Sequence, residues 1–202
     1  QAVGQIPLSM MRLPVDYLSA SAHKFHGPKG VGFLYARKNQ DLSSFIHGGS
    51  QERGKRAGTE NVAGIVGMAQ ALVIAAQEMP YTRGKLTRLR NYFAERVRHE
   101  IPNIRLNGHP YKRLPGNVNF SIEGIDATAL LVLLEEEGIC ASAGSACNTG
   151  QTRISHVIEA IRVPENYAAG SVRFTMGRDT TRRDVDACVD ALKRCVIILR
   201  QG

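Results

Sequence analysis

The chain has 202 residues, which is enough for one domain or for one domain and part of another. Apolar residues make up 43% and charged residues 22%, an ordinary balance for a globular protein, and no uninterrupted apolar run approaches the length of a membrane span. The net charge of +8 is spread along the chain, so direct nucleic-acid binding is not favoured.

The four cysteines lie at positions 140, 147, 188 and 195. They form no Cys-x-x-Cys pair and have no His-x-x-x-His nearby, so the sequence predicts neither a zinc site nor a disulfide scaffold. Cys188 and Cys195 share an apolar helical face and are expected in a core. This usage predicts a reducing, cytoplasmic setting. Because the chain begins with glutamine and has no basic-then-apolar leader, we expect a fragment or a processed product.

Two strands are predicted on either side of Lys24. An apolar run that includes Val15 and Leu18 precedes this lysine, a turn around Gly27 follows it, and a second apolar run covers residues 31–36. A lysine at the end of a strand, among hydroxyl and imidazole groups, suits an amine that forms a Schiff base with an aldehyde cofactor. A solvated lysine in a hairpin turn is the alternative.

A glycine-rich polar loop is predicted over residues 44–59, followed by a helix from Ala63 to Ala76. This helix is apolar nearly all round, which indicates a buried helix. Thr59 stands where the helix should start, so its hydroxyl is expected to cap free backbone donors. After Pro80 the pattern changes to a helical stripe with arginines opposite, and this change marks a domain boundary.

The second part of the chain alternates strands and helices. Alternating apolar residues predict a strand over 118–122, and Asp126 is expected to cap a helix over 127–137 that Gly138 closes. A short strand over 139–141, carrying a buried Cys140, and a loop over 142–151 should follow.

The C-terminal part is expected to hold a helix over 153–162, a strand over 172–176 and a final helix. In the strand, Arg173 falls on the face opposite Val172 and Phe174. The final helix opens with a capping box, Thr181 to Asp184.

Four ordered segments resemble one enzyme family, the pyridoxal-phosphate-dependent cysteine desulfurases of the NifS/IscS type. The first reads Ser-x-Ser-x-His-Lys-x-x-Gly-Pro-Lys-Gly-x-Gly over residues 19–32. The other three cover residues 48–61, 142–147 and 171–178. The resemblance runs from Gln1 to about Leu199. Members of the family are roughly twice this length, so the chain resembles only their C-terminal half.

The resemblance implies an α/β protein of the fold type I pyridoxal-phosphate (PLP) class. Residues 1–80 would form the C-terminal part of the large, PLP-binding domain. Residues 81–202 would form the small α+β domain, which carries the catalytic cysteine loop.

The resemblance also assigns roles to residues of the cofactor site. Lys24 would hold the cofactor's aldehyde and move protons at the substrate Cα. Ser21 and His23, placed on one face of an extended strand, would contact the cofactor's phosphate, and Gln1 would bind its phenolic oxygen. Thr59 would reach the phosphate of the cofactor in the other subunit, which implies a homodimer with shared active sites.

The implied reaction converts L-cysteine to L-alanine and leaves the sulfur as a persulfide on Cys147. Arg173 would bind the substrate carboxylate through its two-pronged guanidinium. An iron–sulfur scaffold or another sulfur-transfer protein would accept the sulfur. His26 has no assigned role.

Two alternatives stay open. A selenocysteine lyase or a class V aminotransferase would keep Lys24 and Arg173 but would not need Cys147. The chain alone could also be an inactive half that lacks the residues of the other half.

Overall fold

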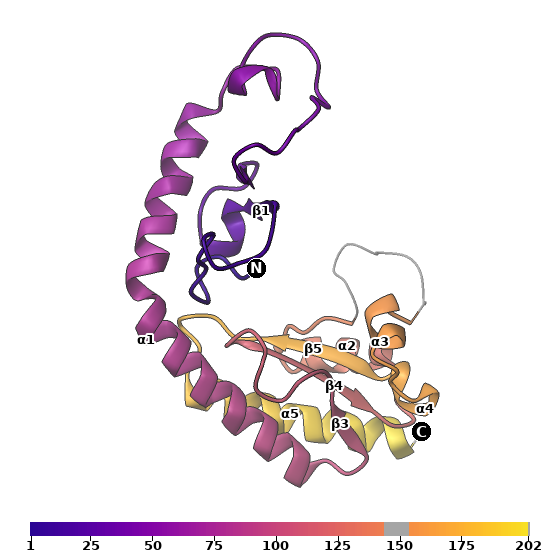
Figure 1. Ribbon diagram of the computed structural model, residues 1–202. Coiled ribbons are helices and arrows are strands. Elements are labelled where there is room, and N and C mark those ends of the chain that lie inside the picture. The colour runs from indigo at the N-terminus through magenta and orange to yellow at the C-terminus, as the bar shows by residue number, and fades with distance from the viewer. Residues whose placement is uncertain (144–153, 202) are drawn as a thin grey trace. The chain divides into compact units, whose positions relative to one another are not determined.

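The structure is a computed structural model that describes residues 1–143 and 154–201. The chain divides into two compact units, Gln1–Tyr81 and Thr82–Gly202, which we call unit 1 and unit 2. The long helix α1 (Val62–Glu100) gives its first part to unit 1 and its second part to unit 2 (Figure 1).

Unit 1 is built on an antiparallel pair of strands, β1 (Tyr17–Ser21) and β2 (Gly32–Ala36). The two predicted strands around Lys24 are therefore confirmed. A short 3₁₀ helix, η1 (Ala22–Phe25), follows β1 directly and starts the return toward β2. A second 3₁₀ helix, η2 (Glu52–Gly54), interrupts the predicted polar loop.

The core of unit 1 is small. Val3, Ala22 and Phe25 are buried, and α1 packs one face against them. That face consists of Met68, Ala71, Leu72 and Ala75. The other faces of the same stretch lie open, since Val66 is 62% and Val73 50% exposed. The prediction that this helix is buried was therefore wrong for all but one of its faces. Apolar composition alone does not reveal how much of a helix surface packs against other residues of the chain.

The absence of an uninterrupted apolar run does not by itself exclude a helix of bilayer length. Within the described residues, α1 is long and apolar enough to cross a membrane by length and composition alone. Gly67 and Gln70 interrupt this stretch, so a search for uninterrupted apolar runs does not find it. The lack of a side chain at Gly67 lets α1 approach Pro28 closely, because a Cβ on Gly67 would lie 2.8 Å from Cγ of Pro28.

The start of α1 differs from the prediction. The side-chain oxygen of Asn61 accepts a hydrogen bond of 3.0 Å from the Gly64 amide, so Asn61 caps the helix and Thr59 does not. The helix also continues through Pro80. The pattern change at Pro80 therefore lies inside one helix, and the assignment of residues 1–80 and 81–202 to two named domains stays a prediction.

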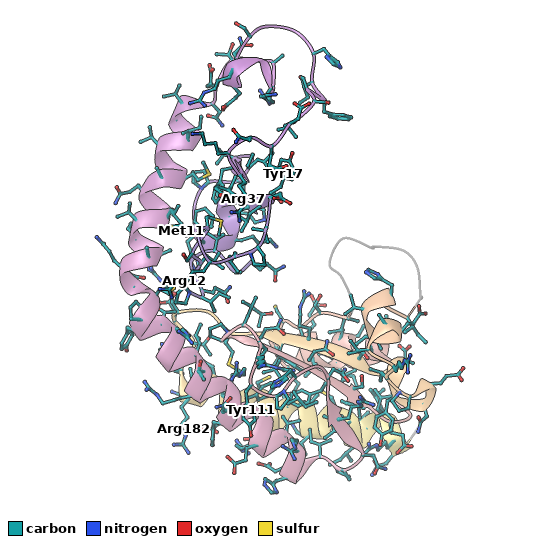
Figure 2. The ribbon with its side chains drawn as sticks, in the orientation of Figure 1. Met11, Arg12, Tyr17, Arg37, Tyr111 and Arg182 are labelled. Carbon is teal, nitrogen blue, oxygen red and sulfur yellow. The ribbon has the colours of Figure 1, made fainter. Side chains whose placement is uncertain are left out.

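Side chains tie the remaining segments of unit 1 to the strand pair (Figure 2). Arg37 donates hydrogen bonds to the carbonyl oxygens of Leu13 and Val15, at 2.7 Å and 3.0 Å from Nη2. The Tyr17 hydroxyl donates one of 2.6 Å to the carbonyl of Asp41. These bonds fix the segments on both sides of the hairpin that carries Lys24.

Unit 2 contains a three-stranded antiparallel sheet in the order β3 (Ile104–Leu106), β4 (Asn117–Ile122), β5 (Ser171–Thr175). Residues alternate between its faces, as predicted. Even-numbered residues of β4 and β5 are buried and apolar: Val118, Phe120, Ile122, Val172 and Phe174. Odd-numbered residues form what we call the polar face: Asn117, Asn119, Ser121, Ser171, Arg173 and Thr175.

Three helices cover the apolar face, namely the second part of α1, α2 (Ala127–Glu136) and α5 (Arg182–Gln201). Phe93 of α1 packs edge-on against Phe120 and Phe174, with ring centroids 5.7 Å and 5.2 Å apart. The predicted helix starts are confirmed. Asp126 accepts from the Ala129 amide, and Asp184 accepts from the Thr181 amide at 2.8 Å.

The segment after α2 departs from the prediction. Residues 139–141 form no strand, and Ser142 makes an isolated bridge to Arg173. Cys140 is exposed, so its predicted burial was wrong, whereas Cys195 is buried as expected. Of the described residues in the predicted helix over 153–162, those of His156–Ala160 are helical (α3), and α4 (Glu165–Ala168) follows. Cys147 lies outside the described residues.

Candidate active site

Lys24 lies on a turn whose other side is anchored in the core of unit 1. A 3₁₀ helix has three residues per turn, so Ala22 and Phe25 fall on one face of η1. Both are buried, at 0% and 3% exposure, while Lys24 is exposed. The backbone amide of His26, in the left-handed conformation at φ 66°, closes the turn by donating to the Ala22 carbonyl. The lysine amine thus projects from a fixed backbone.

Ser21 and His23 flank Lys24, but not as the sequence suggested. Strand β1 ends at Ser21, and His23 already belongs to η1. The argument that both lie on one face of an extended strand was therefore wrong, because the chain turns between them. Both residues are exposed. The structure places an amine, a hydroxyl and an imidazole within four consecutive residues on the surface of unit 1.

This donor set fits the cofactor that the resemblance implies. An aldehyde needs an accessible amine, and a phosphate needs hydroxyl, imidazole and amide donors. Among the described residues, the side chains of Ser21, His23 and Lys24 make no hydrogen bond or ion pair that would occupy these groups. Gln1 and Thr59 are exposed in the same unit, and their cofactor contacts stay predictions.

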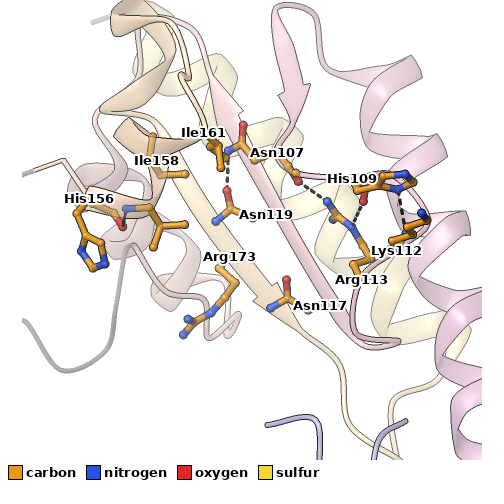
Figure 3. A pocket seen from close by; sticks show the side chains of 13 residues that line it. Asn107, His109, Lys112, Arg113, Asn117, Asn119, His156, Ile158, Ile161 and Arg173 are labelled. Atoms are coloured by element: carbon orange, nitrogen blue, oxygen red, sulfur yellow. Dashed lines mark hydrogen bonds between the residues drawn. The ribbon is translucent and has the colours of Figure 1, made fainter. Parts of the chain in front are cut away.

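Arg173 lies in unit 2, in the middle of the polar face, directly opposite Asn119 of β4. It lines a cavity of about 380 Å³, which we call the Arg173 cavity (Figure 3). Three amides, two imidazoles and three cations lie among its lining side chains: Asn107, Asn117, Asn119, His109, His156, Lys112, Arg113 and Arg173. None of the 13 lining residues is acidic. The cavity therefore favours an anionic ligand.

The rim of the cavity is fixed by its own hydrogen bonds. His109 Nδ1 accepts from the amides of Tyr111 and Lys112, and Arg113 donates to the carbonyls of His109 and Asn107. Burial lowers the pKa of the Arg113 guanidinium, and the nearby charge of Arg90 lowers it further. The hydrogen bonds of the Arg113 guanidinium therefore hold the loop in place, and the Arg173 guanidinium is the group that we expect to bind a ligand.

The strand that carries Arg173 also holds the start of the predicted cysteine loop. The Arg173 amide donates to the Ser142 carbonyl at 2.7 Å, and the Ser142 amide donates to the Arg173 carbonyl at 3.1 Å. Cys147 follows Ser142 by five residues.

The sequence prediction missed Asn119 and Asn107. The signal was present, since Asn117, Asn119 and Ser121 alternate with apolar residues and so must share the face of Arg173. Lys24, Ser21 and His23 belong to unit 1 and Arg173 to unit 2.

A comparison with protein-family models decides the family. The aminotransferase class-V model matches residues 1–188. The chain belongs to the class-V aminotransferase family. The resemblance to the class V aminotransferase superfamily is thereby confirmed, and enzymes of this kind depend on pyridoxal phosphate.

Two curated relatives carry the name cysteine desulfurase IscS. The one from Dictyoglomus turgidum is 49% identical over 99% of this chain, and the one from Methanosarcina thermophila is 44% identical over 99%. A solved NifS-like protein matches with a TM-score of 0.87 and 35% identity over 98% of this chain. The fold is therefore that of the fold type I PLP enzymes, as predicted.

The chain spans about half the length of these relatives: 51%, 49% and 51% respectively. The matched half contains Lys24, Cys147 and Arg173.

Proposed function

We propose that the protein acts as a PLP-dependent cysteine desulfurase, to which this chain contributes the lysine and the cysteine that do the chemistry. The observation that carries the proposal is the setting of Lys24, an exposed amine on a turn fixed by Ala22 and Phe25. The two relatives named cysteine desulfurase support the type of reaction.

Lys24, Ser21 and His23 would hold the cofactor, which supplies an electron sink when bound. The Lys24 amine would hold the aldehyde carbon, while Ser21 and His23 would donate to the phosphate. Gln1 would donate to the phenolic oxygen. Lys24 would also remove and return the proton at the substrate Cα, a role that suits an amine on a rigid backbone.

Cys147 would accept the sulfur. Its thiolate would attack the sulfur of L-cysteine, so that an S–S bond forms as the Cβ–S bond breaks. The electron pair of the broken bond returns to carbon, which takes a proton, and L-alanine leaves. Both thiol protons are accounted for, one on the alanine methyl group and one on the persulfide.

Arg173 would bind the substrate carboxylate. The Arg173 cavity, with cations and no acidic lining residue, supports this role. The bridge between Ser142 and Arg173 supports a short path between the bound substrate and the cysteine loop.

The proposal includes a homodimer in which Thr59 contributes to the partner's cofactor site. Thr59 is exposed and does not cap α1, so its hydroxyl is available for this contact. The sulfur acceptor would be an iron–sulfur scaffold or another sulfur-transfer protein, in a cytoplasmic setting. Neither a membrane nor a nucleic acid is a partner in this proposal.

The test uses the full-length protein that carries this sequence. L-alanine and persulfide are measured after addition of L-cysteine, in the unchanged protein and in Cys147→Ser. We expect equal amounts of both products, and loss of the persulfide in the variant. Borohydride reduction followed by peptide mapping should locate the cofactor on Lys24.

Alanine production that persists unchanged in Cys147→Ser would contradict the desulfurase and would point to a lyase of the same family. Cofactor found on another lysine would contradict the site itself.

A further inference from the structure

Asn119 is the residue that the structure adds to the carboxylate site. It pairs directly with Arg173 across two antiparallel strands, so their Cβ atoms lie about 5 Å apart on the same face. Both side chains line the Arg173 cavity (Figure 3). An anion bound by the Arg173 guanidinium therefore lies within reach of the Asn119 amide.

The orientation of the Asn119 amide is set by Asn107. Asn107 is 3% exposed, and its Nδ2 donates to Asn119 Oδ1 at 2.6 Å and to Ser121 Oγ at 2.7 Å. Because the Asn119 oxygen accepts this bond, the NH₂ group of Asn119 is the end that remains for a ligand. Among the described residues it has no hydrogen-bond partner.

The two possible orientations of the Asn107 and Asn119 amides differ in which buried atom of Asn107 lacks a hydrogen-bond partner. In the observed arrangement the buried Oδ1 of Asn107 lacks a partner. If both amides were reversed, the buried NH₂ of Asn107 would lack one instead. Orphaned N–H groups are rarer in proteins than under-satisfied carbonyl oxygens, so the observed orientation is favoured. Ser121 continues the network by a 2.6 Å bond to Ser171, which ties it to β5.

We propose that Asn119 donates its side-chain NH₂ to the same carboxylate that Arg173 binds, and that Asn107 is a positioning residue that keeps this donor turned toward the ligand. The ligand class is an amino acid recognised through its α-carboxylate. The inference rests on the proposed function through the role of Arg173. It adds a second, uncharged donor, which selects a planar carboxylate over a single point of negative charge.

The decisive variant is Asn119→Asp in the full-length protein. It is isosteric and keeps the oxygen that accepts from Asn107, but it replaces the free NH₂ with a carboxylate oxygen. We expect the KM for L-cysteine to rise about 10-fold or more, as for a lost hydrogen bond to a charged group. For L-cysteinamide, which has no carboxylate, the KM should not rise. Asn166→Ala, which removes an exposed amide of α4 outside the cavity, is the matched control.

Asn107→Asp tests the positioning role. An aspartate at 107 cannot donate, so the Asn119 amide must turn its NH₂ toward it and present its oxygen to the ligand. We expect calorimetry to show weaker binding of L-alanine to this variant, although Asn119 itself is unchanged. As with Asn119→Asp, the loss of affinity should require the carboxylate of the ligand. Asn107→Ala, which leaves Asn119 free to turn, should weaken binding less.

The outcomes separate this inference from the proposed function. If Arg173→Gln raises the KM for L-cysteine and Asn119→Asp does not, the inference is overturned and the role of Arg173 stands. If Asn119→Asp affects L-cysteine and L-cysteinamide equally, Asn119 has only a structural role. If Arg173→Gln leaves the preference for the carboxylate unchanged, the carboxylate site itself is wrong.

Discussion

Ser142 and Arg173 exchange two backbone hydrogen bonds, so the segment that leads to Cys147 is paired with the strand that carries the proposed carboxylate ligand. This pair is isolated, since the described residues on either side of Ser142 belong to no strand. The entry to the cysteine loop thus depends on two bonds.

Replacement of Ser142 by proline should loosen this entry. Proline has no amide hydrogen, so the bond to the Arg173 carbonyl is lost, at a cost of about 1 kcal/mol. We expect a lower melting temperature and a higher KM for L-cysteine. Ser142→Ala keeps the backbone bonds and should behave like the unchanged protein. Equal effects of both variants would show that the Ser142 side chain matters instead.

Lys24 and Phe25 are adjacent in the chain, but Lys24 is expected to serve catalysis and Phe25 to stabilise the fold. Lys24→Ala removes an exposed side chain, so the free energy of unfolding without cofactor should change by less than about 0.5 kcal/mol. Turnover should fall by at least about 100-fold, as for the loss of a general base. Phe25→Ala empties a buried position and should cost about 3–5 kcal/mol. Urea titrations and activity assays separate the two effects.

His26 holds a backbone conformation that suits glycine. At φ 66° a side chain costs about 1 kcal/mol, so His26→Gly should leave stability unchanged or raise it slightly. His23→Gly, at a position inside η1, should lower it by up to about 1 kcal/mol. A loss of cofactor binding in His26→Gly without a loss of stability would give the His26 imidazole a place in the site.

Acid should destabilise unit 2 through Glu100 and Asp186. A hydrogen bond from Arg96 lowers the pKa of the Glu100 carboxyl below its ordinary value of 4.5. Hydrogen bonds from Tyr92 and, to a smaller extent, from Arg96 lower the pKa of the Asp186 carboxyl below its ordinary value of 3.8. The folded state therefore binds fewer protons than the unfolded state. Its stabilisation is present above these ordinary values and is lost as pH falls through the lowered pKa values.

Melting temperatures measured from pH 6 to pH 2.5 test this. Arg96→Met should lower the melting temperature at pH 6 and flatten its decline below pH 4.5. If the melting temperature of the variant fell with pH as steeply as that of the unchanged protein, Arg96 would be excluded as a cause of the acid sensitivity. Lys38→Met removes a cation from outside this network and serves as the control.

The cysteines should differ in reactivity. Burial raises the pKa of the Cys188 thiol to about 12, so very little of this thiol is ionised to the reactive thiolate at pH 8. Cys140 is exposed and should be alkylated by iodoacetamide well before Cys188 and Cys195. Peptide mapping over time, before and after unfolding in urea, measures the order. Equal rates for Cys140 and Cys188 in the folded protein would contradict it.

Local patterns predicted most of unit 2. Strand β4 alternates strictly, α5 carries a strong apolar stripe, and Asp126 and Asp184 mark helix starts by their side-chain chemistry. In each case the interacting groups lie within a few residues of one another, which is why the sequence alone reveals them.

The wrong predictions concern partners that are distant or absent within the chain. Residues 139–141 have strand-like composition, but only Ser142 finds a pairing partner, 31 positions away at Arg173. The first part of α1 reads as buried, yet Val66 and Val73 remain exposed. At the start of α1 two residue types could cap, and the backbone, which the sequence does not display, selects Asn61 over Thr59.

The strict alternation of β4 and β5 has an evolutionary consequence. Even-numbered side chains of these strands carry the packing of unit 2, while Asn117, Asn119 and Arg173 on the opposite face line the Arg173 cavity. A substitution at 117, 119 or 173 can thus alter which ligand is accepted without disturbing the core behind the sheet. A change at 118 or 174 alters how firmly the domain holds together without touching the ligand. Ligand selectivity and thermal stability can therefore change independently of each other as related sequences evolve.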